Sequence, residues 1–215
     1  MNQRSFHITR MAATAILAAS TAATVAAQVD GVKRIEQLIK RSTAAVKAVD
    51  DTKLQIQKTM DAYNLVVAPE TMNRKSAYSK LQKEMDATKK KQAAIAARTG
   101  EARAEADTLF KSWQSSTSTI SDAGLRAKSE QRLAATQARV DEIQTDNAHA
   151  DELYATFMKA LEDRVTYLGH DLNASAVASL KDESATLNTQ ATDLYAAIEK
   201  ATTAANAAIG ALSPE

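Results

Sequence analysis

The chain lacks cysteine and has few residues that interrupt helices. Its 215 residues include no Cys, two Pro and five Gly. Without Cys it cannot form disulfides, use a thiol in catalysis or carry a lipid on a cysteine. So few Pro and Gly over such a length favour long helices over a compact mixed fold.

Aromatic residues are also scarce. They make up 4% of the chain, whereas hydrophobic residues make up 45% and many of these are Ala. A core of Ala, Leu, Ile and Val suits helices that approach closely, but it does not easily fill a thick globular interior.

The N-terminus has the pattern of a secretory signal peptide. Arg4 and Arg10 precede an uncharged run from Met11 to Ala27 that ends in small residues. This order predicts a leader over residues 1–27 that is cleaved after Ala27, and therefore a periplasmic protein. The alternative is an uncleaved membrane anchor. The run contains Ser and Thr and is shorter than the roughly 20 strongly apolar residues of a membrane span, which favours cleavage.

Charge is balanced once the leader is removed. The two leader arginines leave 25 of the 27 Lys and Arg, against 26 Asp and Glu. This balance creates no general attraction for nucleic acid, so no nucleic-acid partner is predicted.

Four stretches of the mature chain repeat apolar residues at alternating three- and four-residue steps. We call each such row a seam, and the spacing is typical of helices that pack against helices. The seams predict helices over residues 31–67, 73–118, 122–168 and 174–211, and short turns make consecutive helices antiparallel. The predicted fold is all-α, an elongated antiparallel bundle of four long helices with coiled-coil-like seams, in one domain over residues 28–215. The alternative is a more open hairpin that a second copy completes.

Polar residues interrupt these seams. The middle of the second seam is small or polar, so its helix is expected to pack either closely or weakly there. Ser42, Lys53, Gln92 and Asn147 also occupy seam positions. Buried polar residues of this kind commonly set register or partner number, although Lys53 can instead extend its ammonium group to the rim.

The charges of the second and third helices are complementary. Residues 74–91 contain seven basic and two acidic residues, and residues 141–152 contain five acidic residues and no basic one. Folding the chain at the second turn brings these blocks together. We therefore predict that Lys89, Lys90 and Lys91 lie beside Asp151 and Glu152.

No catalytic or metal-binding constellation stands out. His149 and Asp151 offer two ligands where a zinc site needs three or four. The chain has no Gly-rich phosphate loop, Gly-x-Ser-x-Gly elbow or Cys–His pair. These observations predict no enzyme and no cofactor, and an enzyme built around His170 is the weakest alternative. Trp113, the only Trp, is expected to fill the core near the second turn.

The segment from Leu161 to Glu183, with the sequence LEDRVTYLGHDLNASAVASLKDE, resembles a signature of the bacterial "domain of unknown function 2959" family. Residues 31–34, 109–113 and 125–133 add to the likeness, which spans about residues 31–208. The resemblance implies an exported, helical protein of the bacterial envelope. It implies no activity, because the family has none assigned.

The polar turn within this segment is the candidate interaction surface. Arg164, Tyr167, His170, Asp171 and Asn173 lie close together in sequence, and the lysine run 89–91 is added to the candidate surface. The alternative is a well-capped turn, which needs the same residue types.

These observations predict a non-enzymatic scaffold or adaptor whose partner is another protein or a second copy. The alternative is peripheral association with a membrane or a cell-wall polymer.

Overall fold

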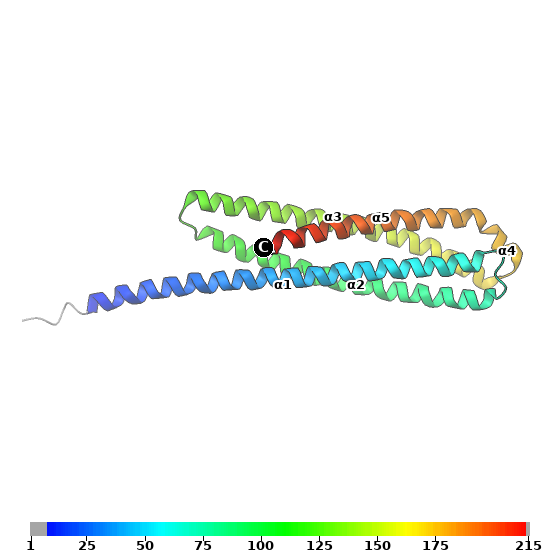
Figure 1. Cartoon of the computed structure of the whole chain (residues 1–215), viewed down its shortest axis with the longest axis horizontal. Coiled ribbons are helices and arrows are strands. Elements are labelled where there is room, and N and C mark those ends of the chain that lie inside the picture. Colours follow the sequence, from blue (N-terminus) through cyan, green and yellow to red (C-terminus); the bar gives the residue numbers. More distant parts are fainter. Residues whose placement is uncertain (1–7, 214–215) are drawn as a thin grey trace, which may run out of the picture.

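The computed structural model describes residues 8–213, and it describes side chains for residues 31–180 and 183–213. Over these residues the chain is all-α without a strand, and the helices pack as a bundle. The helices are α1 (Ile8–Val67), α2 (Arg74–Ser118), α3 (Ala123–His170), α4 (Ala174–Ser179) and α5 (Lys181–Leu212). Figure 1 shows the long helices side by side along one axis, with the short α4 at one end.

Local sequence accounts for the helix ends. α1 ends at Val67, just before the Ala68–Pro69 pair, because a residue before Pro disfavours helical geometry. Each following turn supplies an N-cap side chain. Asn73 accepts a hydrogen bond from the Ser76 amide at 3.0 Å, and Asp122 accepts one from the Leu125 amide at 2.8 Å. The predicted turns before the second and third helices are thus confirmed.

Two helix boundaries differ from the prediction. α1 begins at Ile8 and runs without a break through the Ala-rich residues of the predicted leader, because Ala is the best helix former. Residues 1–7 and 214–215 lie outside the described residues, and cleavage after Ala27 stays a prediction.

The predicted fourth helix is divided at Leu180 into α4 and α5. Leu180 has φ −90° and ψ 0°, and its carbonyl accepts bonds from both the amide and the hydroxyl of Ser184, at 2.8 Å and 2.7 Å. Val177 and Leu180 are nevertheless both buried in the core. Over residues 8–213 the structure therefore has five helices where four were expected.

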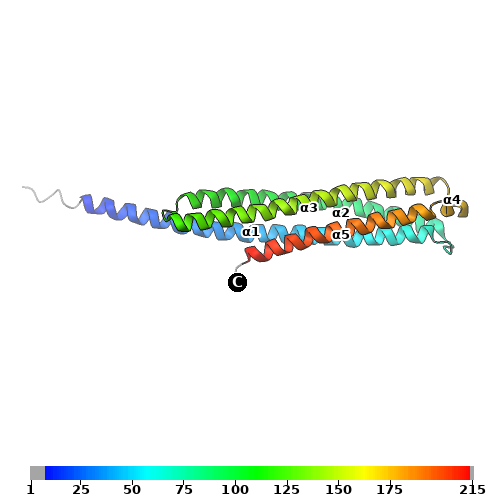
Figure 2. The same cartoon turned by 90° about the horizontal axis from the view of Figure 1, so that it is seen from above.

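The long helices surround one axis. α1 packs against α2 and α5, and α3 packs against the same two helices. The most extensive packing is within the pairs α1–α2 and α3–α5, and α2 and α3 pack against each other least. Figure 2 shows the same arrangement from above.

Each of the four sides carries an ion pair between helices. These pairs are Arg41–Glu101 at 2.9 Å, Lys89–Glu162 at 2.7 Å, Lys200–Asp146 at 2.7 Å and Lys53–Glu199 at 3.2 Å. Most of these side chains are partly exposed, so each pair stabilises the fold by only about 0–1 kcal/mol. The pairs favour the antiparallel register more than they add stability. Lys53 extends its ammonium group to the rim, as the sequence suggested.

The core has two separate clusters of buried side chains. The larger core cluster lies toward α4 and includes Ile56, Leu81, Phe157 and Leu187. The smaller core cluster lies toward the α2–α3 turn and contains Leu38, Ala106, Leu109, Phe110 and Leu133. Trp113 packs against the smaller cluster, as predicted.

The seams are confirmed to different extents. The seam of α4 and α5 is buried at eight successive positions, which are Val177, Leu180, Ser184, Leu187, Ala191, Leu194, Ile198 and Ala201. The first seam is confirmed only in part in its N-terminal half. Ile35 packs against the smaller core cluster and Val46 lines the space between the helix pairs, but Val32 is 55% exposed and the fully buried positions are Leu38 and Ala45. The neighbouring α5 ends at Leu212, so the start of α1 within the bundle has fewer partners.

Candidate functional site

Two side chains of the predicted polar turn, Arg164 and Tyr167, form hydrogen bonds that join neighbouring helices. The Arg164 guanidinium donates to the carbonyl of Ala160 at 2.8 Å and to that of Glu183 at 2.9 Å. The Tyr167 hydroxyl pairs with that of Ser179 at 3.0 Å. Arg164 therefore joins α3 to the first turn of α5, and Tyr167 joins α3 to α4.

The rest of the turn is a cap. The Asn173 side chain accepts a hydrogen bond from the Ala176 amide at 2.9 Å, and Asp171 accepts bonds from the Asn173 amide at 3.0 Å and its side chain at 2.7 Å. His170 is exposed in the last turn of α3. Arg164 and Tyr167 line one open depression, whereas His170, Asp171 and Asn173 lie outside it. The geometry favours the capping interpretation of the turn.

The predicted partners of the lysine run are wrong in detail. Lys89 pairs with Glu162 at 2.7 Å, while Asp151 accepts a bond from Gln92 at 2.8 Å. The predicted antiparallel register is confirmed, because residue 92 lies opposite residue 151. Lys89 pairs instead with a carboxylate ten positions farther along α3 than the predicted Glu152. Over the described residues, neither Lys90 nor Lys91 forms an ion pair.

Sequence reasoning missed a buried polar row between α1 and α2. The Gln55 amide donates to the Glu84 carboxylate at 2.6 Å, and the Thr59 and Thr88 hydroxyls pair at 2.8 Å. Thr52, Gln55 and Thr59 are all buried. Their three- and four-residue spacing beside the apolar seam was the signal that could have revealed them.

Burial raises the pKa of three tyrosines, Tyr63, Tyr154 and Tyr195. The Tyr63 hydroxyl pairs with that of Ser184 at 2.9 Å, and burial raises the Tyr63 pKa. Burial, with a smaller contribution from Glu162, raises the pKa of Tyr154 to about 12. These shifts follow from packing, because desolvation penalises the phenolate. They do not mark an acid–base centre.

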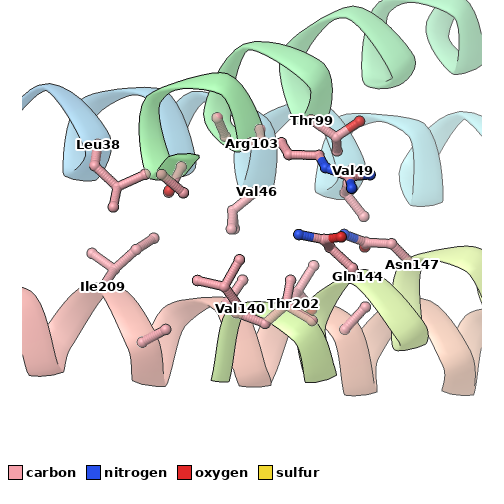
Figure 3. A pocket seen from close by; sticks show the side chains of 18 of the residues that line it. Leu38, Val46, Val49, Thr99, Arg103, Val140, Gln144, Asn147, Thr202 and Ile209 are labelled. Atoms are coloured by element: carbon pink, nitrogen blue, oxygen red, sulfur yellow. The ribbon is translucent and has the colours of Figure 1, made fainter. Parts of the chain in front are cut away.

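The most distinctive site is a cavity between the two core clusters. It has a volume of about 110 Å³ and opens between the α1–α2 pair and the α3–α5 pair (Figure 3). Its lining is mostly aliphatic, with Leu38, Val46, Val140 and Ile209 among the larger side chains. Of the two alternatives predicted for the middle of the second seam, close or weak packing, the structure favours weak packing at Thr99 and Ala102, which are partly buried and line the cavity.

Three polar side chains line this cavity. They are Arg103 from α2 and Gln144 and Asn147 from α3, all labelled in Figure 3; Arg103 is exposed, whereas Gln144 and Asn147 are partly buried. Within the described part of the chain, none of the three forms a hydrogen bond or ion pair. A smaller adjoining cavity of about 40 Å³ shares Val49 and Asn147 with the first. The middle of the bundle is therefore not wholly filled by packed side chains.

Arg103 is the only titratable residue that lines the larger cavity. Over the residues that the structure describes, no group of three or more His, Asp and Glu side chains could hold a metal ion. None of the described helices offers a stretch long and apolar enough to cross a bilayer.

Comparison with known proteins gives one match. A family model described as "Protein of unknown function (DUF2959)" matches residues 24–212. No curated protein and no solved structure is significantly similar to the chain.

Proposed function

Since the chain belongs to the DUF2959 family, whose function is unknown, we propose a role from its geometry: it is an exported periplasmic scaffold or adaptor. It acts without catalysis, through contacts with another protein or a second copy. We further propose that its architecture is an elongated antiparallel bundle of four long helices joined along coiled-coil-like seams.

The length of the molecule carries this proposal. The 45 residues of α2 and the 48 residues of α3 give helices about 70 Å long at ~1.5 Å per residue. A compact domain of 215 residues has a radius of gyration of about 17 Å, which corresponds to a sphere only about 44 Å across. A rod holds partners at a fixed separation and offers long surfaces to them, which is what a scaffold requires.

Export and partner binding can be tested together. The mature protein is purified from the periplasm of its host, and N-terminal sequencing is expected to start at Gln28. Light scattering then gives its mass, and crosslinking in the intact envelope identifies proteins that contact it. We expect either a dimer or a defined envelope partner. A strictly monomeric protein that crosslinks to no envelope protein would contradict the scaffold.

A second candidate function rests on the outer face of α2. Lys80, Lys83 and Lys90 are exposed and, among the described residues, form no ion pair. They form a basic stripe, because residues three and seven apart share one helix face. The exposed Asp86 lies on the same face between Lys83 and Lys90, which leaves the stripe a net charge of +2. Such a stripe suits peripheral binding to an anionic membrane or cell-wall polymer.

Sedimentation with anionic liposomes and with isolated sacculi tests the basic stripe. We expect Lys80→Glu, Lys83→Glu and Lys90→Glu together to abolish co-sedimentation. The matched control changes three exposed lysines elsewhere, Lys58, Lys111 and Lys128, to Glu. If both triple variants lose binding equally, net charge is responsible and the stripe is not a site.

A further inference from the structure

We propose that the 110 Å³ cavity between the two core clusters binds a single-chain amphiphile with an anionic head group, such as a fatty acid. This inference concerns the interior of the bundle and goes beyond its proposed role as a scaffold.

The shape of the cavity suits a linear chain. Its lining runs along α1 from Leu38 to Val49 and along α5 from Ala201 to Leu212, a rise of about 16 Å on each helix. A volume of 110 Å³ encloses only part of an alkyl chain, so the rest of the chain lies along the opening between the helix pairs. A packed helix is about 10 Å across, so a helix of a second copy does not fit between the two pairs.

The lining also suits an apolar chain. Of its 19 residues, most are Ala, Val, Leu and Ile, and Ala102, Ala205 and Ala208 leave the space that larger side chains would fill. Water in a cavity with aliphatic walls finds few hydrogen-bond partners. An alkyl chain, by contrast, gains about 0.8 kcal/mol of binding free energy for each methylene that it buries. The adjoining cavity, which shares Val49 and Ala201, extends the same path toward Tyr154.

The polar residues identify the head group. Arg103 is cationic and exposed at the rim of the cavity, the partly buried Gln144 and Asn147 can each donate from an amide, and the described lining contains no Asp or Glu. The nearest carboxylate in the adjoining cavity, Asp151, already accepts a bond from Gln92 at 2.8 Å. A guanidinium and two amides complement a carboxylate or phosphate and repel a cation.

Trp113 provides a direct readout. It is the only Trp in the chain, and it packs against the smaller core cluster, whose members Leu38 and Ala106 also line the cavity. The probes are dodecanoate and dodecyltrimethylammonium, which have the same chain length and opposite charge, both kept below their micelle concentrations. We expect a saturable change in Trp113 fluorescence with dodecanoate and at least tenfold weaker binding of the cation. Equal binding of the two probes, or no saturation with dodecanoate, would overturn the proposal.

Two variants locate the site. Ala205→Phe fills the cavity and should abolish dodecanoate binding, while Ala104→Phe places the same side chain on an exposed position of α2 and should not. Circular dichroism melting shows whether each variant is folded. Binding that persists in folded Ala205→Phe, or a dimer by light scattering that this variant dissociates, would show that the cavity is not a lipid site.

The head-group assignment is tested on a residue whose change spares the fold. Arg103→Gln should weaken dodecanoate binding about tenfold, the loss expected for one charge-assisted hydrogen bond. Arg139→Gln is the matched control, because Arg139 is exposed on α3 and does not line the cavity. If Arg103→Gln binds dodecanoate as tightly as the wild type, the assignment is wrong, whether or not Ala205→Phe folds.

Discussion

Tyr78 shows how one side chain joins α2 to the end of α3. Its hydroxyl donates to the carbonyl of Val165 at 2.9 Å and accepts a bond from Gln82 at 3.3 Å. The hydroxyl also lies against Gly169, where an added Cβ would be only 2.7 Å away. The glycine in the last turn of α3 therefore makes room for this hydrogen bond.

Replacing Gly169 by Ala should destabilise the protein by about 1–2 kcal/mol, because the new methyl displaces the Tyr78 hydroxyl from Val165. Gly100→Ala is the control. Gly100 lies inside α2 with no atom within 4 Å of an added Cβ, so this change should stabilise by about 0.5–1 kcal/mol. Urea unfolding followed by circular dichroism measures both. Equal effects of the two substitutions would contradict the close contact at Gly169.

Tyrosine ionisation should weaken the fold at high pH. Burial is the main cause that raises the pKa of Tyr154 and that of Tyr195 from 10.0 to about 12, with Glu162 and Asp61 as smaller causes. The folded state holds these protons more tightly than the unfolded state. Their contribution to the unfolding free energy is therefore complete below pH 10 and is lost as the pH rises from about 10 to 12.

Urea unfolding at a series of alkaline pH values measures this loss. The double variant Tyr154→Phe and Tyr195→Phe should lose stability less steeply over the same range, and its absorbance titration should lack the two late-ionising phenols. An identical slope in the variant and the wild type would assign the alkaline loss to other groups.

At the scale of elements, the α1–α2 pair combines apolar packing with a buried hydroxyl pair. Thr59 donates to the Gln55 carbonyl at 3.0 Å and also contacts Thr88 at 2.8 Å. Neither hydroxyl is exposed to water. This pair holds two residues 29 positions apart in one register, since a slip of either helix would leave the buried Thr88 hydroxyl without this partner, whereas Thr59 would keep its bond to Gln55.

A double-mutant cycle tests that role. Thr59→Val leaves the buried Thr88 hydroxyl without its partner and should cost about 1–3 kcal/mol. Thr88→Val should cost less, because Thr59 can still donate to Gln55. The double variant replaces both hydroxyls with methyls of similar shape and should be more stable than the sum of the single changes implies. Strict additivity in urea unfolding would show that the two hydroxyls do not interact.

At the scale of the whole molecule, the bundle is tightly packed at its α4 end and looser in its middle. The larger core cluster includes Leu81 and Met85 of α2. Farther along the same helix, Gln92, Thr99 and Ala102 are only partly buried and line the cavities. A helical segment with few buried apolar contacts unfolds locally at a lower free-energy cost.

Hydrogen–deuterium exchange followed by mass spectrometry should reveal this difference. Amides of residues 92–105 should exchange faster than those of residues 77–89, although both segments belong to α2. Residues 187–198 of α5 contribute Leu187, Leu194 and Ile198 to the larger core cluster, so they serve as a second protected reference. Uniform exchange along α2 would contradict the looser middle.

Much of the fold could be predicted from local patterns. Asp122 and Asn173 were recognisable as N-caps. All eight seam positions from Val177 to Ala201 are buried, as their spacing predicts. The candidate site could not be predicted in the same way. Arg103 and Gln144 fall outside the seams, and nothing in their neighbourhoods along the chain indicates that they face a common space.

By itself the sequence determined the all-α class, the three turns, the antiparallel order and the buried face of α5, because caps, helix propensity and apolar spacing act over a few residues. Only the tertiary structure decided which parts of the other seams are buried, that Lys89 reaches Glu162, and that polar groups of α2 and α3 line one cavity. These features depend on how far each helix extends and how it is rotated against its neighbours, and residues distant in the chain set both.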